Sequence, residues 1–146
     1  MFRRLTKNDR DVYLALTRQF YASDAVLHPV PEENFMRTFS EVTGGGPYAD
    51  CFLFEENGEA AGYALLSFHY SNEAGGLVVW LEEAFIIEKF RSRGLMSAFF
   101  AFLETEYKEK CVGLRLEVEP SNSRAMRLYE KWGFTPLNYS QMVKKI

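Results

Sequence analysis

The sequence predicts an α/β fold whose mixed central β-sheet has six to seven strands, with helices packed on both faces. Two observations lead to this prediction. Segments with strand-like and helix-like periodicity are mixed along the chain, as in a sheet covered by helices. Residues 77–87 are almost continuously apolar, which is typical of a central strand that is covered on both faces.

The N-terminal third predicts one strand followed by two helices. Residues 2–5 form the strand, and Thr6 with Asp9 three residues later is typical of a helix start. Pro31 before two glutamates marks the start of the second helix, which ends at the glycine run 44–46. The apolar faces of these helices are expected to carry Val12, Leu16, Phe20, Phe35, Phe39 and Val42.

A hairpin and a long strand form the centre of the predicted sheet. Asn57-Gly58 is the dipeptide best suited to a tight turn, because both residues tolerate positive φ angles. It separates apolar segments at residues 51–54 and 60–70, which we therefore expect to pair as antiparallel strands. Residues 77–87 follow as the central strand.

The C-terminal half predicts alternating helices and strands. Residues 112–118 alternate apolar and charged side chains, which indicates a half-buried strand. Residues 134–146 are expected to close the sheet as two short strands or one bent strand. The apolar faces of the two helices, one starting near Ser92, are expected to carry Leu95, Phe99, Phe102, Leu103, Ala125, Leu128, Tyr129 and Trp132.

Length and composition fit a single domain, residues 1–146, because 146 residues with 47% hydrophobic side chains can bury a sizeable core. The net charge is −3 and no basic stripe dominates, so nucleic acid is not an expected partner. No apolar run reaches membrane-spanning length, and the start of the chain is charged and then polar. We therefore expect no membrane span and no signal peptide.

The cysteines and histidines do not predict a metal site. Cys51 and Cys111 lack metal-ligand spacing and fall in strand contexts, which favours reduced thiols and a cytoplasmic protein. His28 and His69 lie far apart, with no Cys, Asp or Glu at ligand spacing. We expect each histidine to be a surface, strand or substrate-cleft residue.

The segment between the central strand and the next helix has the composition of an anion-binding site. It places two arginines and a glycine at a helix N-terminus, where unpaired backbone N–H groups and a partial positive charge add to their effect. The alternative is a solvated helix start; no Gly-Lys-Ser/Thr follows, so it is not a Walker loop. The residues expected to bind a pyrophosphate are Arg91, Ser92, Arg93, Gly94, Leu95, Met96 and Ser97.

A second motif follows one helix and one strand later. Residues 122–134 read Asn-Ser-Arg-Ala-Met-Arg-Leu-Tyr-Glu-Lys-Trp-Gly-Phe, which resembles the Asn-x-x-Ala-x-x-x-Tyr-x-x-x-Gly-Phe motif of the GNAT N-acetyltransferase superfamily. The arginine segment is similar to the family's Gln/Arg-x-x-Gly-x-Gly/Ala motif for the pyrophosphate of acetyl-coenzyme A, although Met96 stands where the family prefers Gly or Ala. The resemblance covers most of the chain and implies the GNAT fold, with acetyl-CoA as co-substrate.

The resemblance also assigns roles to single residues. In the family, the pantetheine arm pairs with the backbone of the central strand, which here corresponds to Phe85, Ile86 and Ile87. A backbone N–H near Phe85 or Ile86 is the expected oxyanion donor. Asn122 is an N-cap, a hydrogen-bond partner of the arm, or both. Tyr129 corresponds to the tyrosine that protonates the departing thiolate, and the alternative role is that of a core residue.

An acidic pair on the central strand is expected to face the acceptor. Glu82 and Glu83 stand where polyamine-type members of the family carry a Glu-Asp pair, and one or both can hold a cationic amine or accept its proton. Alternation sends them to opposite faces unless the strand bulges, and the alternative is an exposed pair at a strand end. Tyr21, Asp24 and His28 fall in the family's variable acceptor-facing segment and are expected to shape the substrate pocket.

The resemblance therefore implies an enzyme that transfers the acetyl group of acetyl-CoA to the primary amine of a small cationic molecule. Two alternatives stay open. One is acetylation of a protein lysine or N-terminus, and the other is a noncatalytic sensor that binds acyl-CoA. Members of the family often dimerise, so a homodimer through the C-terminal strands is a further expectation.

Overall fold

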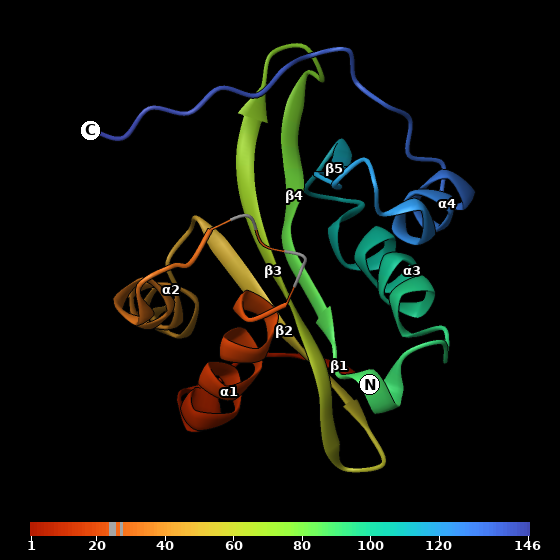
Figure 1. The fold of residues 1–146 in the computed structure, drawn as a ribbon. Helices are drawn as coiled ribbons and strands as arrows, with labels where there is room; N and C mark the ends of the chain where they lie inside the picture. The colour runs from red at the N-terminus through yellow and green to blue at the C-terminus, as the bar shows by residue number, and fades with distance from the viewer. Residues whose placement is uncertain (24–25, 27) are drawn as a thin grey trace.

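The computed structural model, which describes residues 1–23, 26 and 28–146, shows one sheet with α1 and α2 on one face and α3 and α4 on the other (Figure 1). The strands are β1 (Phe2–Arg4), β2 (Ala49–Glu56), β3 (Glu59–Ser71), β4 (Gly76–Ile86) and β5 (Gly113–Leu116). The helices are α1 (Arg10–Tyr21), α2 (Glu32–Gly44), α3 (Leu95–Tyr107) and α4 (Ser123–Lys131). No helix in the described part of the chain is both long and apolar enough to cross a membrane.

The sheet is mixed, as predicted. Its strands lie in the order β1-β2-β3-β4-β5, with β4 and β5 parallel and the other neighbours antiparallel. The predicted turn between β2 and β3 is confirmed, since Asn57 has φ 54° and Gly58 has φ 79°. Two consecutive residues with positive φ are what a two-residue hairpin turn requires.

The prediction of six to seven strands is wrong, because residues 134–146 form no strand. After α4 the chain continues as an extended loop (Figure 1), and no sixth strand is found among the described residues. Apolar and polar side chains do not alternate regularly in this segment. In a strand, Leu137 and Tyr139 would point to one face and Met142 to the other, so neither face would stay apolar. The exposed apolar side chains of residues 134–146 include Leu137, Tyr139, Met142, Val143 and Ile146.

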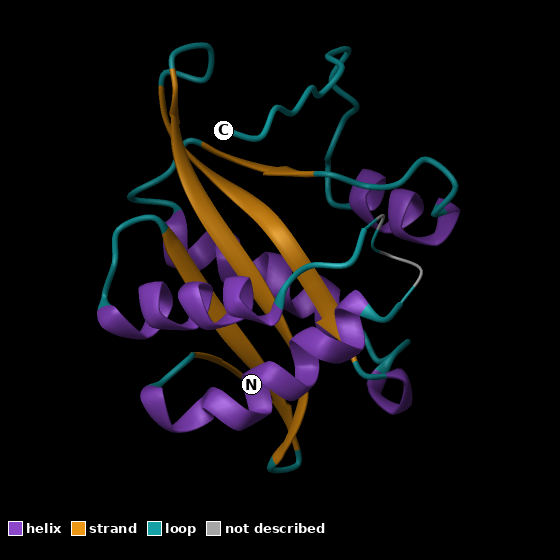
Figure 2. Cartoon of the chain, turned by 60° about the vertical axis from the view of Figure 1, so that its left-hand side comes forward, coloured by secondary structure: helices purple, strands orange, loops and turns teal. Residues whose placement is uncertain are grey.

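Two cores form, one on each face of the sheet. Figure 2 shows α1 and α2 crossing in front of the strands, and their core includes Leu14, Phe35, Phe39 and Tyr63. The core under α3 includes Phe52, Phe54, Phe99, Phe100 and Leu103. Val12, expected on the buried face of α1, is instead 39% exposed. The buried face of α1 is carried by Tyr13, Leu14, Leu16 and Thr17.

Candidate active site

A hollow of about 830 Å³ lies between the two N-terminal helices and the sheet. Three carboxylates line it, from Glu41 of α2 and from Glu82 and Glu83 of β4. A largely apolar hollow with a few converging polar groups is the usual form of a small-molecule site. The other lining residues are Phe20, Tyr21, Val26, His28, Val30, Arg37, Thr38, Tyr48, Ala49, Leu65, Leu66 and Ser67.

A β-bulge brings both members of the acidic pair to this hollow. In the ladder between β3 and β4, Leu65 pairs with Glu83 and Leu66 pairs with Leu81, so Glu82 is an extra residue with no cross-strand partner. An extra residue breaks the alternation of side chains along a strand. Both glutamates therefore line the hollow, whereas a regular strand would send one of them to the opposite face.

Glu83 is partly buried and is held by two tyrosines. The Tyr21 hydroxyl donates to Oε1 and the Tyr63 hydroxyl donates to Oε2, each at 2.5 Å. Burial raises the pKa of Glu83 above its ordinary value, the nearby charge of Glu82 acts in the same direction, and the two hydrogen bonds oppose the rise. A carboxylate with a raised pKa is a stronger proton acceptor than an exposed one. Glu82, in contrast, is exposed and accepts a hydrogen bond from Ser67.

Of the three residues predicted to shape the substrate pocket, the structure places two at the hollow. Tyr21 and His28 both line the hollow with the acidic pair. Asp24 lies outside the described residues. His69 is elsewhere on the sheet, with its ring edge-to-face against Trp80 at a centroid distance of 5.8 Å. Within the described residues, no group of three or more His, Cys, Asp or Glu side chains is placed to hold a metal ion.

The loop before α3 presents a helix N-terminus to solvent. Ser92 has φ 65° and Gly94, the N-cap, has φ 78°. These left-handed residues turn the chain so that α3 begins at Leu95, three residues later than predicted. The first N–H groups of α3 have no intrahelical acceptor, and such groups can bind an anion together with the helix dipole.

The arginines of this loop are bonded to the protein. Arg91 Nε donates to the carbonyl oxygen of Ile86 at 2.9 Å, and Arg93 donates to the carbonyl oxygen of Lys89 at 2.7 Å. These bonds shape the loop, while both side chains add positive charge beside the helix N-terminus. Met96 packs against the core under α3, so its side chain is compatible with an anion that binds to backbone N–H groups.

The two sequence motifs meet in space. An Arg124 guanidinium N–H donates to the hydroxyl oxygen of Ser92 at 2.8 Å, which joins the start of α4 to the loop before α3. Asn122 caps α4, because its Oδ1 accepts the N–H of Ala125 at 3.1 Å. This confirms the N-cap role and leaves the side-chain NH₂ group as a donor for a second partner.

Tyr129 lies in α4, on the face of the sheet opposite Glu83. Its ring packs against Phe100 and Phe134, each at a centroid distance of 5.9 Å. Burial raises the pKa of Tyr129 above its ordinary value. No other described residue makes a hydrogen bond with its hydroxyl. The residue is therefore part of the core under α3, and its hydroxyl is at the same time available as a proton donor.

The outer edge of β4 is open beyond the end of β5. The ladder between them runs from the pair Val78–Gly113 to the pair Leu81–Leu116. Beyond Leu81, β4 pairs only with β3 among the described residues. Unpaired backbone groups at such an edge can bind an extended molecule as an added strand. The predicted arm-binding residues Phe85, Ile86 and Ile87 lie at this end of β4 and pack their side chains into the cores.

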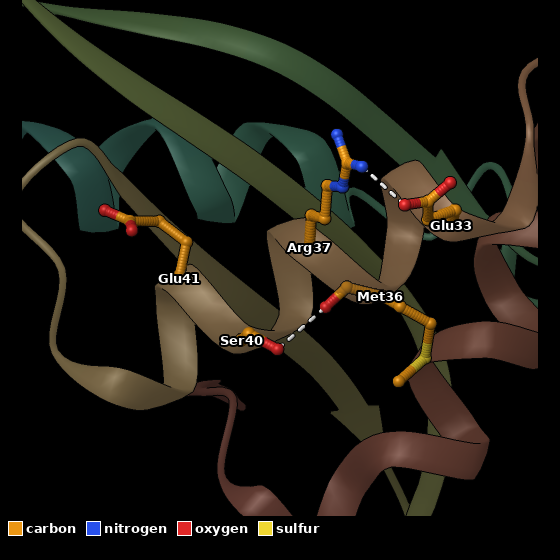
Figure 3. A pocket seen from close by; sticks show the side chains of 5 residues that line it. All are labelled: Glu33, Met36, Arg37, Ser40 and Glu41. Carbon is orange, nitrogen blue, oxygen red and sulfur yellow. Dashed lines mark hydrogen bonds and ion pairs between the residues drawn. The ribbon is translucent and has the colours of Figure 1, made fainter.

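A smaller hollow of about 440 Å³ is lined by α2 alone (Figure 3). Arg37 donates to Glu33 one turn earlier, and the Ser40 hydroxyl donates to the Met36 carbonyl oxygen at 3.0 Å. These bonds are local to the helix surface. We assign the smaller hollow no role in catalysis.

The model of the acetyltransferase (GNAT) family matches residues 11–134. The chain belongs to this family. It is therefore an acetyltransferase that depends on acetyl-CoA, as the two motifs predicted. A search of curated protein sequences gave no match.

Solved structures share the fold of this GNAT acetyltransferase. A possible acetyltransferase from Clostridium difficile 630 is 15% identical with a TM-score of 0.84, over 100% of this chain and 97% of that one. The aminoglycoside N-acetyltransferase AAC(6')-Iy, in complex with a CoA bisubstrate analogue, is 20% identical with a TM-score of 0.81, over 100% and 97%. A ribosomal-protein-alanine N-acetyltransferase from Brucella melitensis biovar Abortus 2308 is 14% identical with a TM-score of 0.79, over 100% and 98%. At these identities the likeness concerns the fold.

Some residues at the site of this GNAT acetyltransferase were not predicted from the sequence. Glu41 and Ser67 come to the hollow from α2 and β3, and their sequence positions carry no motif. Tyr63 bonds to Glu83 but reads as an ordinary core residue of a strand. The one feature of the sequence that could have pointed to Tyr63 is its residue type, since a buried tyrosine hydroxyl usually has a hydrogen-bond partner.

Proposed function

We propose that this protein acetylates the primary amine of a small cationic molecule. The observation that supports this acceptor most is the hollow lined by Glu41, Glu82 and Glu83. Carboxylates gathered in one hollow attract a cationic amine and raise its local concentration. Two of them lie on β4, the strand whose open edge suits the acetyl donor, so that amine and donor would meet on one strand.

Acetyl-CoA is proposed to bind along the open edge of β4, with its pyrophosphate at the N-terminus of α3. The backbone of the edge would pair with the pantetheine arm, and the N–H groups after Gly94 would bind the phosphates. The proposed contacts are Phe85, Ile86, Ile87, Arg91, Ser92, Arg93, Gly94, Leu95, Met96, Ser97, Asn122 and Tyr129.

The proposed reaction divides proton handling between the two faces of the sheet. Glu83 takes a proton from the ammonium group, and the freed nitrogen attacks the thioester carbonyl. The C–N bond forms, the C–S bond breaks, and Tyr129 gives its phenolic proton to the sulfur. The second proton of the attacking nitrogen then returns to the Tyr129 phenolate through water, and Glu83 releases the first proton to solvent. A backbone N–H near Phe85 or Ile86 stabilises the oxyanion in between. The exposed Glu82 holds the charge of the incoming amine.

Acetyl-CoA binding and acceptor class are tested on one sample. A ligand that binds only the folded protein, at about 100 times its Kd, adds roughly 2.7 kcal/mol of stability, so thermal unfolding should shift upward with acetyl-CoA. A thiol-release screen then compares polyamines, an aminoglycoside, a neutral-chain monoamine and a peptide with N-terminal alanine. We expect the fastest release with the small polycations. Release with the peptide alone would favour a protein acceptor instead, and the absence of a thermal shift would contradict the proposed donor site.

Replacing Gly94 with Ala tests the pyrophosphate site. No atom lies within 4 Å of a Cβ added there, so the effect comes from the φ of 78°. A left-handed conformation costs an L-residue about 1–2 kcal/mol, and relaxing it would move the N–H groups that follow. We expect weaker acetyl-CoA binding by calorimetry. Gly45→Ala is the matched control, because Gly45 has the same φ and the same open surroundings at the end of α2; it should lose similar stability and keep wild-type affinity.

The cytoplasmic location and the homodimer stay predictions. The cysteines Cys51 and Cys111 are free, which suits a reducing compartment. The exposed apolar side chains after α4 are a candidate dimer contact, and sedimentation velocity of the full chain would measure the oligomeric state.

A further inference from the structure

Tyr63 is a fully buried tyrosine whose hydroxyl bonds to the proposed proton acceptor. Its exposed fraction is 0%, and its ring packs against Tyr13, Phe20 and Phe85 at centroid distances of 5.9, 6.3 and 6.4 Å. Its hydroxyl donates to Oε2 of Glu83. Packing therefore fixes the ring of Tyr63, and the hydroxyl on that ring holds the Glu83 carboxylate in place.

The two tyrosines that hold Glu83 differ in their access to the hollow. Tyr21, at the end of α1, lines the hollow, whereas Tyr63, in the middle of β3, does not. An acceptor in the hollow can therefore touch Tyr21 directly. Tyr63 can affect that acceptor only through Glu83.

Packing alone does not require a hydroxyl at this position. Phenylalanine would fill the same space among aromatic neighbours, and a buried hydroxyl costs free energy unless it is hydrogen-bonded. The partner here is a carboxylate, and bonds to a charged acceptor are about twice as strong as bonds between neutral groups. Each oxygen of Glu83 takes one tyrosine bond, which leaves further lone pairs for an ammonium group.

We propose that Tyr63 is a positioning residue for acetyl transfer, whose hydroxyl keeps Glu83 ionised and oriented toward the acceptor amine. This inference rests on the proposed function, in which Glu83 takes the proton of the amine. A hydrogen bond to the ionised form of a carboxyl group favours that form and so opposes the effect of burial. Without the bond, Glu83 keeps its proton to a higher pH and loses one of its two fixed contacts.

Titratable groups from every neighbouring element lie in the hollow that Glu83 lines or in the core beside it. They are Tyr13 and Tyr21 of α1, Arg37 and Glu41 of α2, Cys51 of β2, Tyr63 of β3, Glu82 of β4, and His28 between α1 and α2. Among these described residues, the hydrogen bonds to Glu83 come from Tyr21 and Tyr63. Tyr13 is buried in the same core, but its hydroxyl makes no hydrogen bond to Glu83 among the described residues. Tyr13→Phe is therefore the matched control for Tyr63→Phe.

The test is the pH profile of kcat/KM for both variants, with the amine found in the screen. Loss of a hydrogen bond to a charged group should lower kcat/KM about 10- to 100-fold on the acid side of the profile. In Tyr63→Phe the acid limb should move to higher pH, with the Kd for acetyl-CoA unchanged. In Tyr13→Phe the limb should stay at its wild-type position even if stability falls.

A carboxyl ¹³C NMR titration of Glu83, assigned with Glu83→Gln, gives a reading that needs no substrate. We expect the titration of Glu83 to move to higher pH in Tyr63→Phe and not in Tyr13→Phe. An unmoved titration and limb in an active Tyr63→Phe variant, or an equal shift in both variants, would overturn the role of Tyr63 alone. A moved titration in a protein that acetylates no amine would overturn the proposed function instead, and with it the catalytic purpose of the contact.

Discussion

Glu83→Gln is expected to lower kcat for acetyl transfer by about 10²–10⁴-fold, with little change in the Kd for acetyl-CoA. Glutamine keeps the size of the side chain and an oxygen that accepts a tyrosine bond, but it cannot take a proton from an ammonium group. Glu83 lies in the hollow under α1 and α2, away from the loop before α3, so donor binding should be spared. Initial rates and calorimetry with acetyl-CoA measure the two effects.

The pH dependence of the wild-type enzyme provides a second test of the role of Glu83 as proton acceptor. A general base works when it is deprotonated, so kcat/KM should rise with pH as Glu83 loses its proton. Because burial raises the pKa of Glu83, this acid limb should lie above the ordinary range of a glutamate side chain. The limb should be absent from the profile of Glu83→Gln, whose residual rate follows the fraction of free amine.

Two further substitutions separate the role of Glu83 from general effects of charge. Glu104 is an exposed residue of α3 outside the hollow, and Glu104→Gln should keep wild-type rates. Glu82→Gln should raise KM for the amine more than it lowers kcat, because Glu82 is exposed and acts by attraction. Loss of turnover in Glu82→Gln with an active Glu83→Gln would reverse the two roles.

Local signals in the sequence predicted most of the fold. The turn at Asn57-Gly58 follows from the conformational preferences of two residues, and the apolar segment that became β4 follows from its composition. The strand count failed because residues 134–146 have strand-forming composition without a sustained alternation. Whether such a segment joins a sheet depends on tertiary partners, and β5 offers it only the four residues Gly113–Leu116.

The site was predictable where it depends on backbone geometry and less so where it depends on register. The position of Gly94 before α3 and the cap at Asn122 are local features, and the structure has both. The orientation of Glu82 depends on a bulge that only the pairing of β3 with β4 reveals. The contact between Tyr63 and Glu83 joins residues 20 positions apart through the same register, and no spacing rule along one strand could predict it.

Tyr129→Phe is expected to lower kcat by about a hundredfold or more while acetyl-CoA binding and stability stay near wild type. The ring contacts with Phe100 and Phe134 do not involve the hydroxyl, so phenylalanine should pack equally well. A raised phenol pKa keeps the proton on Tyr129 at neutral and moderately alkaline pH, as a proton donor to the departing thiolate requires. Single-turnover rates and denaturant unfolding measure the two sides of this prediction.

Tyr107→Phe serves as the control, because we expect it to lower stability and keep turnover, the opposite of what we expect for Tyr129→Phe. Tyr107 belongs to the same core under α3, but its hydroxyl donates to the carboxylate of Asp50. Loss of a hydrogen bond to a charged group costs about 1.5–3 kcal/mol, so this variant should lose stability and keep its turnover per folded molecule. If Tyr129→Phe instead loses stability and keeps turnover, Tyr129 is a core residue alone, and the proton for the thiolate must come from another group or from water.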